Sequence, residues 1–369
     1  MFRYRDKTLA GRIAERLESM RLDISLMHVC GTHQDTIIRH GLDETFKRCG
    51  IKVRQGPGCP VCVTTTKEFG EAIALARSGR VIATFGDVAK APSKLGSLLD
   101  QCAEGCDVRI VYSVEDALEI AKKIRIDVVF MAVGFETTAP STAKVLLDGP
   151  PENFSILCCH RHIPPALNTL LGMGELRIDG LIEPGHVSTV IGLKPYEGIS
   201  QKYQIPQVVA GFEPLDMLMA AYMLARQIKK GEARVENEYK RSVRYEGNPK
   251  ALRAMEEVFQ PSDIAWRGFP IISKSGMALR KEFREYDARK RFEDELKKVD
   301  ETFFEESKGC RCGEILRGLL DPEECQLFGK VCTPEAPVGP CMVSVEGACN
   351  IQFKYRSKKS FLDNFGVRT

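Results

Sequence analysis

Short apolar runs alternate with helical patterns along most of this chain. The runs have the length of strands and lie at residues 23–29, 51–54, 81–85, 108–112, 126–133, 154–158, 180–182 and 207–210. Gly and Pro are frequent in the turns between them. Because parallel strands need long crossover connections, this alternation predicts parallel sheets covered by helices, an α/β fold.

The chain has 369 residues, which is more than one hydrophobic core usually serves. Hydrophobic residues make up 43% and charged residues 28%, as is typical of a globular protein. We therefore expect two similar parallel-sheet α/β domains, residues 1–122 and 123–232, followed by a C-terminal helical and Cys-rich region, residues 233–369. The charged stretch from 233 to about 306 is predicted to be mostly helical.

Composition excludes several classes of protein. The formal net charge of +3 is small for this length and favours no nucleic-acid partner. No window approaches the eighteen uninterrupted apolar residues of a membrane span. The N-terminus is charged and amphipathic, with Leu9, Ile13 and Leu17 four residues apart, so it predicts a surface helix rather than a signal peptide. We expect a cytoplasmic protein with fourteen cysteines, and in that reducing compartment thiols bind metals or exchange electrons more often than they form structural bridges.

Six of the cysteines lie close together near the C-terminus, in a Gly- and Pro-rich segment. They are Cys310, Cys312, Cys325, Cys332, Cys341 and Cys349. A cubane [4Fe-4S] cluster needs four thiolates, because soft sulfur ligands match iron, and two cysteines then remain for a redox dithiol beside it. A structural zinc site is the first alternative, although the gaps exceed the two to four residues usual between its paired cysteines. Structural disulfides come third, because the compartment is reducing.

A second cysteine pair lies in a Gly-rich turn after a predicted strand. The turn reads Gly56-Pro-Gly-Cys-Pro-Val-Cys62, and Thr65 with Glu68 forms a capping-box pattern for the helix beyond it. Because the positive end of a helix dipole favours thiolate, Cys59 and Cys62 are interpreted as a redox or metal-handling pair. Half of a zinc ribbon is the alternative, but it requires a second Cys-x-x-Cys that the sequence lacks.

Cys30 and His33 lie in the loop that follows the first predicted strand. Open α/β sheets place their sites at the carboxyl ends of strands, so these two residues are expected to converge with Cys59 and Cys62. Taken singly, Cys30 is equally consistent with a buried small side chain, and His33 with an ordinary residue at a helix start.

Two loops of the second predicted domain each supply one ionisable side chain. Glu136 lies in Gly134-Phe-Glu-Thr-Thr138, and His186 lies in Glu183-Pro-Gly-His-Val-Ser188. Either loop could bind an anion, or supply an acid or base that faces the first domain. Simple helix capping by the nearby hydroxyls of Thr138 and Ser188 is the alternative explanation.

The combination of motifs is more specific than any one of them. They are Cys30-Gly-Thr-His-Gln34, Gly56-Pro-Gly-Cys-Pro-Val-Cys62, Gly134-Phe-Glu-Thr-Thr138, Pro184-Gly-His-Val187, Trp266-Arg-Gly268 and Cys310-x-Cys-Gly-Glu-Ile-Leu-Arg-Gly318. Together they resemble the motifs of the HypD family of hydrogenase maturation proteins, over nearly the whole length. The resemblance implies a scaffold of two α/β domains and a cluster-bearing C-terminal region, on which the Fe(CN)2CO group of [NiFe] hydrogenases is assembled. It also implies cluster surroundings like those of ferredoxin:thioredoxin reductase.

The resemblance implies roles for individual residues. The ligands of the [4Fe-4S] cluster are matched by Cys310, Cys325, Cys332 and Cys349. The redox pair beside the cluster is matched by Cys312 and Cys341. Cys30 matches the cysteine that holds the transient iron of the Fe(CN)2CO precursor, His33 lies beside it, and Cys59 with Cys62 matches the essential pair near the interdomain cleft.

The implied partners are the small chaperone HypC, which would share the iron, and HypE, which would deliver cyanide. The hypothesis is that electrons enter at the cluster, pass through Cys312 and Cys341, and support chemistry at an iron near Cys30, Cys59 and Cys62. The protein would then be a redox-active assembly scaffold rather than a stand-alone enzyme. The alternative is a cluster-driven protein disulfide reductase, which would need neither HypC nor HypE.

Overall fold

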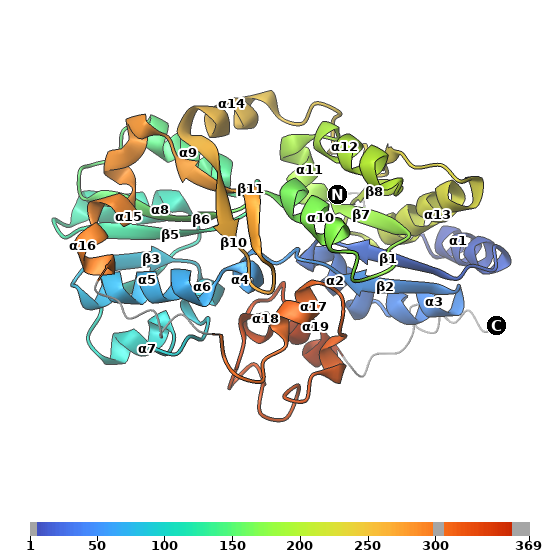
Figure 1. Ribbon diagram of the computed structural model, residues 1–369, viewed down its shortest axis with the longest axis horizontal. Coiled ribbons are helices and arrows are strands. Elements are labelled where there is room, and N and C mark those ends of the chain that lie inside the picture. Colours follow the sequence, from blue (N-terminus) through green and yellow to red (C-terminus); the bar gives the residue numbers. More distant parts are fainter. Residues whose placement is uncertain (1–5, 298–305, 356–369) are drawn as a thin grey trace.

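The computed structural model describes residues 6–297 and 306–355, which form two parallel sheets with a Cys-rich region at their junction (Figure 1). The order of strands in the first sheet is β2 (Ile51–Gln55), β1 (Ile24–His28), β7 (Gly180–Pro184), β8 (Gln207–Ala210) and β9 (Val235–Asn237). In the second sheet it is β4 (Val108–Ile110), β3 (Val81–Thr84), β5 (Val128–Gly134) and β6 (Phe154–His160). All neighbouring strands in both sheets run parallel, which confirms the predicted fold class.

The grouping of strands is the main correction to the sequence analysis. The prediction groups β1 and β2 with β3 and β4 in residues 1–122, whereas β1 pairs with β7 and β3 pairs with β5. The chain leaves the first sheet after β2, builds the second from β3 to β6, and returns at β7. Boundaries at 122 and 232 therefore do not separate the sheets. An apolar run identifies a strand, but it does not identify the neighbour with which that strand pairs.

Helices cover both faces of each sheet, as a parallel sheet requires. One face of the first sheet packs on α1 (Lys7–Ser19), α2 (Gly31–Arg39), α3 (Leu42–Arg48) and α13 (Pro214–Lys230). The other face packs on α10 (Ile163–Met173), α11 (Gly185–Ile191) and α12 (Lys194–Tyr203). The second sheet has α8 (Val114–Lys123), α9 (Ala139–Leu147) and α14 (Pro249–Val258) on one face. Its other face carries α5 (Thr66–Arg77) and α7 (Leu98–Ala103), and α6 (Gly86–Ala89) follows β3.

The stretch from 233 to 297 contains strands as well as helices, which corrects the prediction of a mostly helical segment. After β9 and α14, the strands β10 (Phe259–Ala265) and β11 (Ile271–Leu279) form an antiparallel hairpin. Short helices follow it, η1 (Lys281–Tyr286), α15 (Ala288–Arg291) and α16 (Glu293–Leu296). Residues 298–305 of the same stretch lie outside the described residues.

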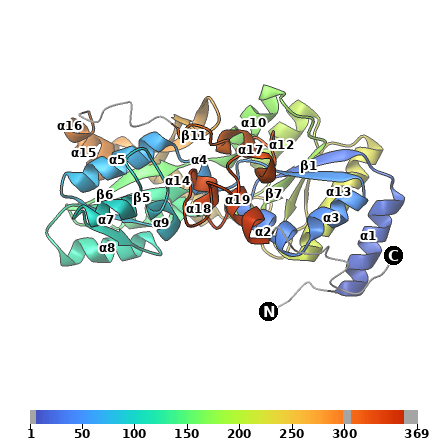
Figure 2. The same ribbon diagram turned by 90° about the horizontal axis from the view of Figure 1, so that it is seen from below.

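The Cys-rich region fills the space at the junction of the two sheets (Figures 1 and 2). Its helices are α17 (Cys312–Leu316), η3 (Pro322–Glu324), α18 (Pro340–Val343) and α19 (Ala348–Tyr355). One hydrophobic cluster runs from the first sheet through Ile315 and Met342 of this region into the second sheet. Among the helices within 6–297 and 306–355, none is long and apolar enough to cross a membrane.

The carboxyl ends of the strands in both sheets lie at this junction. The chain crosses to the second sheet directly after β2, and it returns to α10 on the first sheet directly after β6. Because all strands within a sheet are parallel, the other strands of each sheet end on the same side. The loops that sequence analysis singled out, which follow β1, β2, β5 and β7, therefore come together.

Candidate functional site

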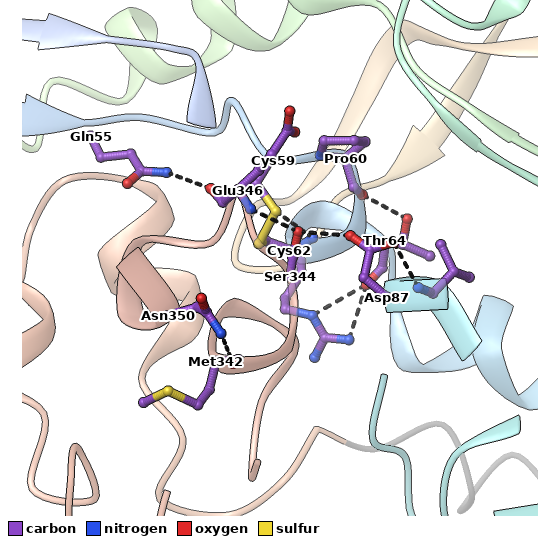
Figure 3. Close-up of a disulfide and its surroundings, with 12 residues drawn as sticks. Gln55, Cys59, Pro60, Cys62, Thr64, Asp87, Met342, Ser344, Glu346 and Asn350 are labelled. Carbon is purple, nitrogen blue, oxygen red and sulfur yellow. Dashed lines mark hydrogen bonds between the residues drawn. A yellow bond between two sulfur atoms is a disulfide. The ribbon is translucent and has the colours of Figure 1, made fainter. Parts of the chain in front are cut away.

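Cys59 and Cys62 lie at the junction and are joined as a disulfide (Figure 3). They belong to a short helix, α4 (Pro60–Val63), whose N-cap is Cys59. The N–H of Cys62 donates to Sγ of Cys59 at 3.2 Å. Pro60 suits the first helical position, where its missing N–H needs no partner. Both cysteines are fully buried, so the disulfide is shielded from reductants in solution.

The Cys30 loop touches the Cys59 turn through the backbone. Cys30 is the N-cap of α2 and is buried. The N–H of Gly31 donates to the carbonyl of Gly58 at 3.3 Å. A Cβ atom at position 58 would overlap the backbone of Val29 and Cys30, so only glycine permits this approach. The structure thus brings together the two turns that carry Cys30, Cys59 and Cys62.

Glu346 lies on the other side of Cys30, where its backbone leaves no room for a side chain at Gly31. Burial raises the pKa of the Cys30 thiol to about 12, and the Glu346 carboxylate contributes to the rise. Burial also raises the pKa of Glu346 to about 7, with a smaller contribution from Asp87. A carboxyl group that titrates near neutral pH therefore lies beside a buried thiol. Sequence reasoning missed Glu346, because no local pattern distinguishes it from a surface acid.

The segment around Glu346 ties the Cys-rich region to both sheets (Figure 3). Oγ of Ser344 donates to the carboxylate of Asp87, on α6 after β3, at 3.0 Å. The side-chain amide of Gln55, at the end of β2, donates to the carbonyl of Glu346 at 3.5 Å. One short segment therefore contacts the carboxyl end of a strand in each sheet.

The four cysteines matched to cluster ligands line one small apolar cavity. Cys310, Cys325, Cys332 and Cys349 share this lining with Cys312. The remaining walls are mostly apolar, with Ile315, Leu327, Phe328 and Met342. Gly339 lies so close that a Cβ atom there would come within 2.5 Å of the Cys310 sulfur and 2.8 Å of the Cys312 sulfur. The backbone at Gly339 therefore forms part of the wall of the cavity that the thiols line.

This donor set fits a cubane cluster. A [4Fe-4S] cluster takes one thiolate on each of its four irons, so its ligands surround a cavity rather than converge on one point. A tetrahedral zinc ion instead needs its ligands around a single point. Within the described ranges, no three His, Cys, Asp or Glu side chains are grouped so that they could hold a single metal ion. The lining of the cavity therefore supplies the four soft donors that a cubane cluster would need.

Cys312 and Cys341 lie between this cavity and the disulfide. Both are buried, and the thiol of Cys312 is within hydrogen-bonding distance of the thiols of Cys310 and Cys341. Cys312 begins α17 and Cys341 lies in α18, and both helices pack against α4. The pair therefore lies in helices that contact the helix of Cys62, and Cys312 also lines the cavity.

His33 and His186 both contact the ring of Phe212. His33 is fully buried, and its Nε2 donates to the carbonyl of Ala210 at 3.3 Å. Burial lowers the pKa of His33 to about 3, so the ring is neutral. His186 stacks on Phe212 with ring centroids 3.8 Å apart. It follows β7 in the same sheet as Cys30, which corrects its predicted place in a separate second domain.

Glu136 follows β5 of the second sheet, and its side chain contacts the start of α10, which covers the first sheet. Its carboxylate accepts a hydrogen bond from the N–H of Ile163, the first residue of α10, at 3.1 Å, and lies 3.2 Å from Nδ1 of His162. This acid therefore holds the start of a helix that covers the first sheet. Neither nearby hydroxyl caps a helix, since Thr138 makes no cap hydrogen bond and Ser188 donates to the carbonyl of Pro184. The capping explanation of these hydroxyls is wrong.

Fold and site together define an α/β protein with a cysteine-rich site at the junction of two parallel sheets. The family model described as HypD, hydrogenase formation hypA family, matches residues 5–356. A putative hydrogenase expression/formation protein of Methanocaldococcus jannaschii is 48% identical over 349 residues, 94% of each chain. The hydrogenase maturation factor HypD of Cupriavidus necator is 42% identical over 369 residues, 95% of this chain and 96% of the relative. The HypD of Rhodobacter capsulatus is 41% identical over 367 residues, 95% and 97% of the two chains.

The chain therefore belongs to the HypD family of hydrogenase formation proteins. This confirms the resemblance found in the sequence.

Proposed function

We propose that this protein is a hydrogenase maturation factor that serves as a redox scaffold for assembly of the Fe(CN)2CO group. One observation carries the proposal, the unbroken series of cysteines across the junction. It begins with the four around the cavity, continues with Cys312 and Cys341, and ends at the disulfide and Cys30. The names of the relatives from Cupriavidus necator and Rhodobacter capsulatus support the same function.

Cys310, Cys325, Cys332 and Cys349 would hold a [4Fe-4S] cluster, which when bound supplies electrons one at a time. The Cys312 and Cys341 thiols reduce Cys59–Cys62 by thiol–disulfide exchange. The freed thiolates and Cys30 then present soft ligands to the iron substrate, which suits low-valent iron that carries cyanide and carbonyl. Glu346 can accept the proton that Cys30 must release before it binds the iron.

The proposed partners are a HypC-type chaperone that shares the iron and a HypE-type cyanide donor. Oxygen-free purification with iron and acid-labile sulfide analysis tests the resident cluster, for which about four of each per chain are expected. Cys30→Ala should abolish hydrogenase maturation and leave the electron paramagnetic resonance spectrum of the cluster intact. Loss of the cluster in this variant would contradict the division into two sites.

The disulfide is also consistent with a second function, that of a protein disulfide reductase driven by the cluster. That function predicts catalytic reduction of a protein disulfide by the purified chain without HypC or HypE. An assay that finds no such turnover, together with maturation activity in the presence of both partners, favours the scaffold.

A further inference from the structure

The tip of the β10–β11 hairpin lies between the two redox pairs. On one side, the N–H of Arg267 donates to the carbonyl of Val63, the last residue of α4, at 2.9 Å. On the other side, Gly268 lies against the backbone of Gly313, the second residue of α17, and a Cβ atom there would overlap it. The φ of Gly268 is +80°, which glycine adopts readily. The tip therefore contacts both the helix with Cys62 and the helix that begins with Cys312.

Arg267 is fixed at this tip by several contacts. Its Nε and Nη2 atoms donate to the carbonyl of Thr64 at 3.2 and 3.0 Å, and Nη1 donates to Oγ1 of Thr66 at 3.4 Å. The guanidinium also pairs with Glu306, whose side chain is 50% exposed, whereas that of Arg267 is only 6% exposed. The cation is thus buried and immobile, while its carboxylate partner faces solvent.

The same guanidinium lies within electrostatic range of the cluster-side thiols. The charged or polarisable groups that act on it include Cys312, Cys341, Cys310 and Glu68. Arg267 in turn acts electrostatically on the sulfurs of Cys312 and Cys341. Because buried charges are weakly screened, such an interaction is stronger than one between surface groups. One positive charge therefore lies at the end of the disulfide helix and acts on the sulfurs of the dithiol.

We infer that Arg267 is a positioning residue for thiol–disulfide exchange between the Cys312/Cys341 pair and the Cys59–Cys62 disulfide, where it stabilises the negative charge that passes between them. This inference rests on the proposed function. A thiolate of the first pair attacks one sulfur of the disulfide, and the other sulfur leaves with the electron pair as a thiolate. The second cysteine of the first pair then breaks the mixed disulfide. Two electrons and two protons have moved, Cys312–Cys341 is oxidised, and Cys59 and Cys62 are reduced.

The attacking thiolate of the Cys312/Cys341 pair and the thiolate that leaves the Cys59–Cys62 disulfide both carry negative charge near the guanidinium. A donor that is already fixed there needs no reorganisation during the step, so it lowers the barrier more than a mobile side chain would. The hydrogen bonds from Arg267 to the carbonyl of Thr64 also fix the position of the end of α4 relative to α17. Arg267 therefore acts on the exchange step both through its charge and through its contacts with the end of α4.

The test follows reduction of Cys59–Cys62 in the full-length, cluster-loaded protein. The disulfide form is treated with dithionite without oxygen, quenched with an alkylating reagent at timed intervals, and analysed by mass spectrometry. Arg267→Met should slow the reduction by roughly 100-fold, the lower end of the range for loss of one fixed donor to a developing charge. Arg267→Lys keeps the charge and should recover most of the rate.

Glu306→Gln gives a second, opposite readout at an exposed side chain. It removes the carboxylate that partly neutralises Arg267, so reduction should become faster. Structural damage to the hairpin would slow reduction in both variants. A slower rate in Glu306→Gln would therefore overturn the inference.

Arg161→Met is the matched structural control. Arg161 is also buried, and it donates to the carbonyl of Ala265 in the same hairpin at 2.9 Å. It also pairs with Glu68 of α5. An equal loss of rate in Arg161→Met and Arg267→Met would show that only packing matters and would overturn the inference. An unchanged rate in Arg267→Met, with the cluster spectrum intact, would do the same.

Cys312→Ser and Cys341→Ser separate the inference from the proposed function. Both variants should block reduction of Cys59–Cys62. If either leaves the rate unchanged, the exchange route in the proposed function fails and the role of Arg267 fails with it. If both block reduction and Arg267→Met does not slow it, the proposed route stands and the inference alone fails.

Discussion

Burial raises the pKa values of several acidic side chains, among them Glu346, to about 7, and Glu183, to about 8. Glu183 lies on β7 and is fully buried, and its carboxyl oxygens have no hydrogen-bond partner among the described residues. An ionised carboxylate is costly in such surroundings, so the folded protein favours the neutral acid. The folded chain therefore holds a proton that the unfolded chain releases between pH 4.5 and about 8.

Glu183→Gln should stabilise the protein above pH 8 and have little effect near pH 4.5. Within that window the folded state binds more protons than the unfolded state, so the free energy of unfolding falls as pH rises. Glutamine does not ionise and avoids this loss, which is on the order of several kcal/mol. Thermal unfolding of variant and wild type at pH 5 and pH 8.5 measures the difference. Equal shifts in the two buffers would contradict the assignment.

Glu346→Gln should make Cys30 more reactive above neutral pH. Loss of the carboxylate removes one cause of the raised Cys30 pKa, so a larger fraction of the thiol is ionised and alkylation is several-fold faster. In the wild type Glu346 is itself neutral well below pH 7, so the two proteins should react alike near pH 5.5. Mass spectrometry of Cys30 after timed alkylation gives the rates. A difference that persists at pH 5.5 would show that packing, not charge, is responsible.

At the scale of elements, a substitution at the start of α18 tests whether the cavity binds the proposed cluster. Gly339 is its N-cap, and a methyl group there would press on the sulfurs of Cys310 and Cys312. Gly339→Ala should therefore lower iron and sulfide well below about four per chain. Gly11→Ala is the control, because that helical site has nothing within 4 Å and the change should leave the cluster content intact. Full iron content in Gly339→Ala would show that the cluster is held elsewhere.

Sequence patterns identify single elements better than pairs of elements. All eight predicted strands exist, because buried strands of parallel sheets form continuous apolar runs. The β10–β11 hairpin was not predicted, since residues 259–265 contain Gln, Pro, Ser and Asp and are largely exposed or half-buried. The sequence could place Cys30 and Cys59 at the ends of strands, because each follows an apolar run that predicts a strand. Arg267 and Glu346 could not, because their roles depend on contacts with segments distant in sequence.

At the scale of the whole molecule, the two sheets are interleaved in the chain and share one central region. Strands on both sides of the insertion β3–β6 build the first sheet, so cutting the chain at residue 122 would separate β1 and β2 from β7. The Cys-rich region contributes Ile315, Met342 and several cysteines to the hydrophobic cluster that joins the sheets. The sequence predicts two sheets and a Cys-rich region, but not that the last part packs between the first two.

Removal of the cluster should consequently loosen the junction more than the distant helices. The cavity cysteines belong to the central hydrophobic cluster, whereas α8 and α9 pack in a core that contains no cysteine of the C-terminal region. After chelation of the iron without oxygen, amide hydrogen exchange in residues 310–355 and 60–64 should rise by about tenfold or more, because local opening becomes easier. Exchange in α8 and α9 should change little. A uniform rise over the whole chain would mean that the cluster stabilises the entire fold, and no change at 310–355 would mean that these cysteines hold no cluster. Only the predicted gradient is consistent with the proposed cluster binding at the junction of the two sheets.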